Sequence, residues 1–230
     1  MDALINGPSR VRSQQAADQV YEQLRDMILS LRLTPGTVLS RSELQRQFGL
    51  SSTPIRDALM RLDEAGLVEV FPQSGTIVSL INLPLARQAQ FLRRAIELEV
   101  VRILAEAPDV NLIQRLRVVI DEQQRRAKEQ DLERFNELDL AFHKILYDAA
   151  GMPDLWSLVR SRSGHIDRIR RLHLPIDGKT AQIVRDHSAI VNAISQGQPG
   201  LAQSELRDHL SRSLAFSDKL RARFPGYFQE

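Results

Sequence analysis

The sequence of 230 residues contains no cysteine, and aromatic residues make up only 5% of it. Without cysteine, neither disulfide bonds nor thiolate metal sites can form, so we expect a protein of the reducing cytoplasm. No run of apolar residues approaches the roughly 20 that a membrane span requires. The polar stretch from Met1 to Arg12 lacks the apolar segment of a signal peptide. The sequence therefore predicts a cytoplasmic protein with no membrane partner.

A strong excess of charge of one sign is also missing. The formal net charge is +2, and residues 1–79 hold eight Arg, no Lys and nine Asp or Glu. A domain that binds nucleic acid is usually basic, so DNA binding by this part of the chain depends on a local arginine patch. Contact with another protein is the alternative. Hydrophobic residues at 43% suffice for a packed core, and the length suits one large domain or two small ones.

The stretch from Ser51 to Leu62 has the pattern of a helix with polar groups at its start. Ser51 is a suitable N-cap, and Pro54 falls in the first turn, where its missing N–H costs nothing. The apolar face repeats at helical spacing through Ile55, Ala58, Leu59 and Leu62. A shorter amphipathic turn precedes it and ends at Gly49. Two short helices joined by a glycine-containing turn predict a helix-turn-helix.

The residues that follow predict a β-wing. Two short segments, 67–71 and 76–78, are rich in strand-forming residues, and the turn residues 72–75 join them. An amphipathic helix over residues 14–33 precedes the helix-turn-helix. Together these elements predict a winged helix-turn-helix over residues 14–79, after a flexible N-terminal arm over residues 1–13.

A more specific pattern runs through this domain. It consists of Pro35-Gly36, Leu39-Ser40, Glu43-Leu44, Phe48-Gly49-Leu50-Ser51, Thr53-Pro54-Ile55-Arg56-Asp57-Ala58-Leu59, Arg61-Leu62, Gly66-Leu67-Val68 and Gly75. It resembles the DNA-binding domain of GntR-family transcription regulators. The resemblance implies double-stranded operator DNA as a partner, contacted by Arg41, Ser51, Ser52, Thr53, Arg56 and Gly75. Serines at 42, 52 and 74 stand where the family commonly has basic residues, so the operator is expected to differ from the commoner family sites.

The rest of the chain predicts an antiparallel six-helix bundle, which makes the protein mainly α. After a linker at residues 80–85, helical patterns run over 84–106, 110–129, 131–150, 153–174, 178–196 and 199–222. The breaks between them are short and carry Pro, Gly or Asp. We place an all-helical domain at residues 86–222 and a tail at residues 223–230.

Four side chains on the apolar faces of three of these helices can hold a metal. Asp139 and His143 are one turn apart on the third bundle helix, His187 lies on the fifth and His209 on the last. Buried polar groups are costly unless paired, and imidazole with carboxylate suits zinc and neighbouring transition metals. We therefore expect a metal site here; a hydrogen-bonded polar cluster is the alternative.

The pattern Asp139-x-x-Phe142-His143, then Asp186-His187, then His209 is similar to the metal-binding version of the FCD domain, the helical effector domain of FadR-type GntR regulators. The resemblance implies a divalent metal, zinc first with nickel or manganese as alternatives, held by these four residues. It also implies a small carboxylate effector that occupies the remaining metal positions.

Two arginines are candidates for binding that effector. Arg162 projects from the centre of the apolar face of the fourth predicted bundle helix, where a guanidinium needs an anion. A position at the bundle end, or a pair with Glu99, is an equal alternative for Arg162. Arg93 and Glu97 resemble a recurrent pair of the first FCD helix, but on a helical wheel they lie off the central stripe, so Arg93 ranks second.

The sequence thus predicts a metabolite-responsive, DNA-binding transcription regulator that acts as a homodimer. The resemblance implies a repressor that the ligand releases, with activation as the alternative that no residue excludes. The alternative is a helical-bundle metalloenzyme with an appended winged helix. Against an enzyme, the interior offers no general base beyond the ligands, and the Glu-x-x-His pairs of di-iron bundles are missing.

Overall fold

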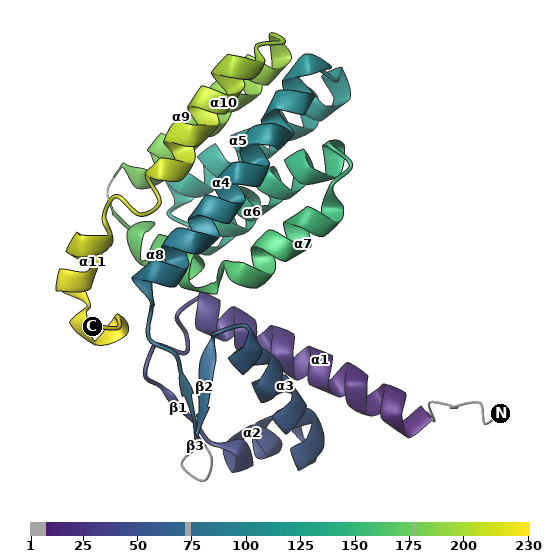
Figure 1. Cartoon of the computed structure of the whole chain (residues 1–230), viewed down its shortest axis with the longest axis vertical. Coiled ribbons are helices and arrows are strands. Elements are labelled where there is room, and N and C mark those ends of the chain that lie inside the picture. The colour runs from purple at the N-terminus through teal and green to yellow at the C-terminus, as the bar shows by residue number, and fades with distance from the viewer. Residues whose placement is uncertain (1–7, 72–74, 177) are drawn as a thin grey trace. The chain divides into compact units, whose positions relative to one another are not determined.

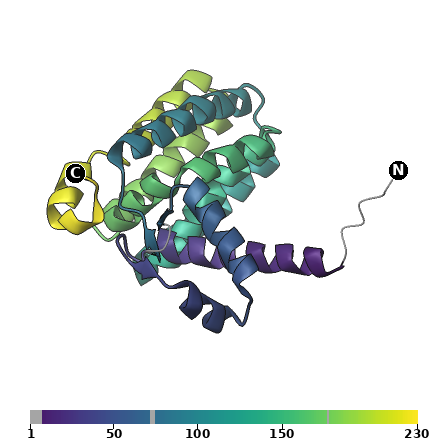
Figure 2. The ribbon, with the colours of Figure 1, turned by 60° about the horizontal axis from the view of Figure 1, so that its bottom comes forward.

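The structure is a computed structural model that describes residues 8–71, 75–176 and 178–230. The chain folds into two compact units. One contains the residues up to Leu83 together with Arg223–Glu230, and the other is Pro84–Ala222. The elements of both are labelled in Figure 1 and seen from a second direction in Figure 2.

The N-terminal unit is a winged helix-turn-helix, as the sequence predicts. Its elements are α1 (Pro8–Leu29), β1 (Val38–Leu39), α2 (Arg41–Phe48), α3 (Ser52–Glu64), β2 (Val68–Phe71) and β3 (Gly75–Val78). The strands form an antiparallel sheet in the order β1-β3-β2, and β2 and β3 are the wing, with Val68 opposite Val78 and Phe71 opposite Gly75. Strand β1 was not predicted, because two residues are too few to show an alternating pattern.

Capping groups and one apolar core hold the two short helices in place. The Oγ of Ser40 accepts a hydrogen bond from the amide of Glu43 at the start of α2, and Gly49 ends this helix with a φ of 65°. The buried faces of α1 and α3 meet in a core that includes Val20, Leu24, Ile28, Ile55, Leu59 and Leu62. Each such side chain contributes roughly 2 kcal/mol when fully buried, so this core fixes the orientation of α3.

Both ends of the first helix differ from the prediction. Helix α1 begins at Pro8 rather than Gln14, so the arm predicted over residues 1–13 is wrong from Pro8 on, and residues 1–7 lie outside the described residues. Proline is favoured in a first helical turn, which explains the earlier start. The helix ends at Leu29, before Leu31 takes up a φ of 62° that a right-handed helix cannot contain.

The second unit is a helical bundle whose long helices run alongside one another in Figures 1 and 2. Its helices are α4 (Leu83–Glu106), α5 (Val110–Glu129), α6 (Leu132–Ala149), α7 (Pro153–Arg162), α8 (Gly164–His173), α9 (Lys179–Ser195), α10 (Pro199–Ser211) and α11 (Ser217–Arg223). Helix α5 packs against α6 and α9, and α9 packs against α10. These contacts enclose a core that contains Leu116, Phe142, Leu146, Ile190, Ile194 and Leu206.

Two of the six predicted helices are each divided. The segment predicted over residues 153–174 breaks at Ser163, whose hydroxyl donates to the carbonyl of Arg160 and also bonds Asp167. Side-chain bonds of this kind compete with the helical backbone pattern, and Gly164 follows immediately. The segment predicted over residues 199–222 stops at Ser211 and resumes at Ser217.

The C-terminal residues predicted as a tail pair with the chain near Ile81. After a short 3₁₀ turn at Pro225–Tyr227, Phe228 forms a parallel bridge with Ile81. The amide of Ile81 donates to the carbonyl of Tyr227 at 2.7 Å, and the amide of Gln229 donates to the carbonyl of Ile81 at 3.0 Å. Both bridge residues are buried, so the residues after α11 cover the stretch that was predicted as a linker. Among the described residues, no helix is both long and apolar enough to cross a membrane.

Candidate metal centre and DNA-contacting surface

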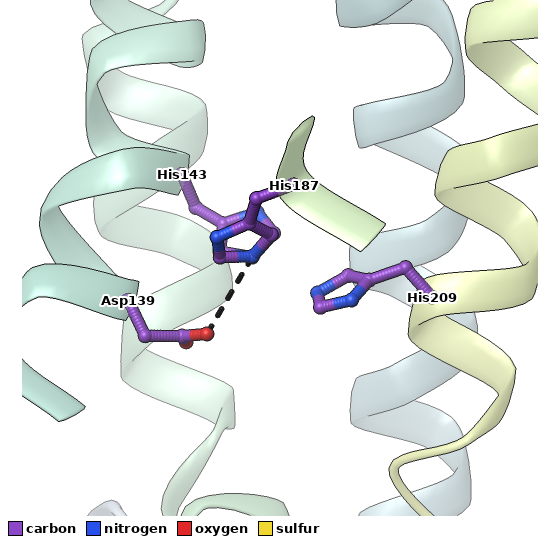
Figure 3. Close-up of side chains that lie close together, drawn as sticks. All are labelled: Asp139, His143, His187 and His209. Atoms are coloured by element: carbon purple, nitrogen blue, oxygen red, sulfur yellow. Dashed lines mark ion pairs between the residues drawn. The ribbon is translucent and has the colours of Figure 1, made fainter. Parts of the chain in front are cut away.

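The four predicted metal ligands lie together inside the helical unit. Asp139 and His143 project from α6, His187 from α9 and His209 from α10, and Figure 3 shows their side chains converging on one space. One potential ligand atom from each lies within 4.8 Å of the others, and all four residues are buried. Ligand atoms on one ion with bonds of about 2.1 Å stand about 3 to 4.2 Å apart. A small contraction of the set would therefore enclose a metal ion.

Each histidine has a side-chain oxygen close to its Nδ1 atom, and in His187 and His209 the two atoms are hydrogen-bonded. The Nδ1 of His187 is 2.9 Å from Oε1 of Gln123, and the Nδ1 of His209 is 3.4 Å from Oδ2 of Asp186. The Nδ1 of His143 lies 2.9 Å from Oε2 of Glu97, a close approach in which neither atom makes a hydrogen bond among the described residues. Oxygen acceptors at Nδ1 favour the tautomer that carries its proton there and leave the Nε2 lone pair free. This arrangement is typical of histidines that bind a metal through Nε2.

The atoms that face the common space have no partner in the described structure. They are Oδ1 of Asp139 and the Nε2 atoms of His143 and His187, all of them buried. The Nε2 of His187 lies 3.6 Å from Oδ1 of Asp139, an ion-pair contact drawn as a dashed line in Figure 3 and too long for a hydrogen bond. A hydrogen-bonded polar cluster, the alternative to a metal, would pair these atoms with one another. Their isolation fits a metal ion.

The protonation states also suit metal binding. Burial lowers the pKa of His143 to about 4, and the nearby Arg93 acts in the same direction. Burial and the neighbouring His209 lower the pKa of His187 well below its ordinary value. Burial alone would raise the pKa of Asp139, but Arg170 and the three histidines hold it far below its usual range. At pH 7 His143 and His187 are therefore neutral and Asp139 is ionised, which are the forms that bind divalent metals.

Arg93 and Glu97 are part of this centre, although on the helical wheel they were assigned off the central stripe of α4. Both are buried, and the Nε of Arg93 donates to Oε1 of Glu97 at 2.7 Å. The wheel was wrong because the buried face of α4 runs continuously through Ala89, Arg93, Glu97 and Val100. The Nη2 of Arg93 is buried without a partner in the described structure, so one donor of this guanidinium is still available.

Arg162 does not face the interior. It is the last residue of α7 and is exposed. The wheel that placed it inside also used Ile166 and Ile169, which follow the break and belong to α8 with a different phase. Glu99, the alternative partner considered for Arg162, pairs with Arg102 instead. The prediction that Arg162 projects into the pocket was wrong.

A different arginine occupies the place that Arg162 was expected to fill. Arg170 of α8 forms an ion pair with Oδ2 of Asp139 and lines a pocket beside the metal ligands. This pocket is partly open to solvent. Its walls are formed by Phe135, Asn136, Asp139, Arg170, His173, Leu174, Lys179, Ile183, His209 and Ser213. Helices α6, α8, α9 and α10 thus line this pocket, and Arg170 and Lys179 are the two cationic side chains in its walls.

The predicted DNA-contacting residues form an exposed set at the start of α3. Ser51, Ser52, Thr53 and Arg56 are exposed, whereas Ile55 between them is buried. The guanidinium of Arg56 lies 3.4 Å from Asp57, a surface contact too weak to hold it away from another anion. Arg41 is exposed at the start of α2.

Two details of this surface differ from, or add to, the prediction. Ser51 occupies the N-cap position of α3, but its side chain makes no capping hydrogen bond. A capping hydroxyl often accepts from the third helical amide, and that residue is Pro54, which has no N–H. Gly75 begins β3 with a φ of 111°, a conformation that favours glycine, and an added Cβ would meet only Val38 at 3.9 Å. Ser74 lies outside the described residues.

Comparison with known proteins assigns both units. Residues 16–78 match the family model described as bacterial regulatory proteins, gntR family, and residues 89–212 match the FCD domain. The chain is 38% identical to an uncharacterized HTH-type transcriptional regulator in an unstable DNA locus of Streptomyces ambofaciens, over 91% of the chain and 88% of the relative. It is 27% identical to the HTH-type transcriptional repressor RspR of Escherichia coli K12, over 95% of the chain and 96% of the relative.

Solved structures show the same fold. Escherichia coli McbR/YncC superposes with a TM-score of 0.75 at 19% identity and covers 91% of this chain and 98% of its own. A putative GntR regulator from Rhodococcus sp. RHA1 superposes with a TM-score of 0.69 at 20% identity, covering 93% and 99%.

Proposed function

The chain belongs to the gntR family of bacterial regulatory proteins and is a DNA-binding transcription regulator with an FCD domain, and from this premise we propose that it is a metal-dependent repressor released by a small carboxylate. Repression is supported by the likeness to the repressor RspR. The metalloenzyme alternative has no support, since the matched domains and the relatives are regulators.

DNA recognition is assigned to the exposed start of α3. This helix enters the major groove, where Arg56 contacts a base or a phosphate and Ser51 and Thr53 contact phosphates. Arg41 adds a phosphate contact, Ser52 faces the base edges, and Gly75 lets the wing approach the minor groove. Paired half-sites about one helical turn apart require two recognition helices, so the repressor acts as a homodimer.

The metal proposal is carried by one observation, the inward-facing atoms of Asp139, His143 and His187 that have no partner in the described structure. Together with His209 they offer three imidazoles and one carboxylate, a set that suits zinc, with nickel or manganese as alternatives. When bound, the metal supplies positive charge to which a carboxylate can coordinate directly.

The effector is assigned from charge and from the free donors around the ligands. A divalent ion and the cationic pocket residue Arg170 outweigh the charge of Asp139, so the interior needs a further anion. A carboxylate next to the ligands is also offered the buried Nη2 of Arg93, which has no partner in the described structure. Bidentate or charge-assisted bonds from arginine are the usual way to fix such a group.

Elemental analysis of protein purified without chelator tests the metal. We expect about one divalent ion per chain, lost in His187→Ala and retained in His165→Ala, which removes a buried histidine outside the four. Both variants are checked for helicity by circular dichroism. Wild-type protein that carries no metal after dialysis against zinc, nickel or manganese would refute the proposal.

A further inference from the structure

The pocket beside the metal ligands carries more positive charge than one carboxylate needs. Of its two cations, Arg170 is engaged by Asp139 and lies 3.9 Å from Asp167. Lys179, the first residue of α9, has no carboxylate within 4.0 Å among the described residues, although it lines the same pocket. Its ammonium group is therefore the pocket cation without an ion pair among the described residues, since the nearby Asp186 pairs with Arg212.

The placement of Lys179 separates it from the metal ligands. It begins α9, two helical turns before His187 on the same helix, and the pocket extends from Asp139 and His209 to its side chain. The walls of the pocket also include the apolar side chains of Phe135, Leu174 and Ile183. A ligand held at both ends thus has charged groups at its termini and a short carbon chain between them.

The charge balance leads to the same requirement. Among the residues that line the pocket, a bound metal, Arg170 and Lys179 bring four positive charges against the single negative charge of Asp139. The two carboxylates just outside the lining, Asp167 and Asp186, are each paired with a further arginine, Arg160 and Arg212 respectively. A monocarboxylate leaves two of the three excess charges without a partner, whereas a diacid leaves one. Uncompensated charge in a partly enclosed site is costly, so the diacid is favoured.

We propose that the effector is a small diacid, with one carboxylate at the metal and a second anionic group at Lys179. This inference rests on the proposed function, since it takes the metal to be bound by the four ligands. The polar side chains of Asn136 and Ser213 on the same walls offer hydrogen bonds to a hydroxyl or keto group on the connecting chain.

Matched pairs of acids that differ only at the far end test the proposal. The pairs are butyrate and succinate, 2-hydroxybutyrate and malate, and pentanoate and glutarate, each titrated into metal-loaded protein by calorimetry. A fourth pair, glycerate and 3-phosphoglycerate, asks whether the second group is a phosphate. In at least one pair the diacid should bind about tenfold more tightly or better, the effect expected of one charged hydrogen bond.

Lys179→Met removes the charge while keeping the length of the side chain, and it should bring the members of that pair to equal affinity. The matched control is Lys144→Met, since Lys144 is exposed on α6, pairs with Asp148 and does not line the pocket. It should keep the wild-type preference.

Failure of this inference and failure of the metal centre give different results. If no diacid binds better than its monoacid, or if Lys179→Met keeps the preference, the diacid proposal is overturned while the measured metal content still stands. If a diacid is preferred and the preference depends on Lys179 but survives removal of the metal by chelator, then the second anionic group is supported and the proposed metal contact is wrong.

Discussion

Gln123 offers the sharpest test of how the metal centre is built. This residue of α5 is fully buried, and its Oε1 lies 2.9 Å from Nδ1 of His187. Gln123→Met keeps the volume and removes the acceptor. Loss of such a supporting partner typically weakens metal binding 10- to 100-fold, or about 1.4 to 2.7 kcal/mol. Without its acceptor, the ring of His187 can exchange tautomers and turn its Nε2 away from the metal.

The stability of the metal-free protein should change much less than the metal affinity. The variant leaves Nδ1 of His187 unpaired, a cost of about 1 to 3 kcal/mol. It also removes Nε2 of Gln123, itself a buried donor without a partner in the described structure, which offsets part of that cost. A purely structural glutamine would show the opposite pattern, with lower stability and unchanged affinity.

Competition with a chromophoric chelator gives the affinity, and urea unfolding of the chelated protein gives the stability. Gln124→Met, at the exposed neighbouring position of α5, is the matched control and should behave like wild type in both. Gln123→Glu keeps an acceptor in place and should restore much of the affinity. Wild-type metal affinity in Gln123→Met, with helicity intact, would refute the reasoning.

Three further predictions concern other parts of the chain. Arg56→Ala should weaken operator binding by about 1 to 3 kcal/mol in fluorescence anisotropy while leaving the thermal midpoint unchanged; equal affinity would show that Arg56 does not contact DNA. Because the folded pKa of His143 is about 4, below its unfolded value of about 6.5, the unfolded state binds more protons between these values. The chelated protein should therefore lose up to about 3 kcal/mol as the pH falls from 6.5 to 4, and urea unfolding of His143→Gln should show a shallower loss. Deletion of residues 224–230 removes the contact of Phe228 with Ile81 and two backbone hydrogen bonds. It should lower the unfolding free energy of the N-terminal unit by about 2 to 4 kcal/mol. An unchanged denaturation curve would contradict this.

The convergence of the four candidate ligands could be predicted because each carries its own signal in the sequence. Asp139 and His143 are one turn apart, and His187 and His209 are each surrounded by apolar residues at helical spacing, so each position is polar where the pattern demands an apolar side chain. Because four such polar side chains are buried in one unit, they are expected to lie close together, where they can share a partner. The wing and the recognition helix were predictable for a similar reason, since their turn and capping residues act locally.

The pocket arginine was misassigned because a helical wheel requires an unbroken helix. The wheel that placed Arg162 inside assumed a continuous helix over residues 153–174, and the break at Ser163 changes the phase of everything that follows. In the new phase Arg170 reaches Asp139. The signal for the break was present in the adjacent Ser163 and Gly164, a pair that commonly marks a turn. Interpreted as two helices, the same sequence favours Arg170 over Arg162.

The acceptors behind the histidines could not be predicted in the same way. Gln123 is one of several glutamines on α5, and its neighbour Gln124 is exposed, so nothing in the local pattern distinguishes the two roles. What distinguishes them is the packing of α5 against α9, which brings Gln123 to His187 across 64 positions of sequence. The ligands follow from a pattern within each helix, whereas the tautomer of each ligand follows from which helix lies beside it. Metal affinity depends on both, so a variant such as Gln123→Met tests the packing of the bundle as much as the chemistry of the site.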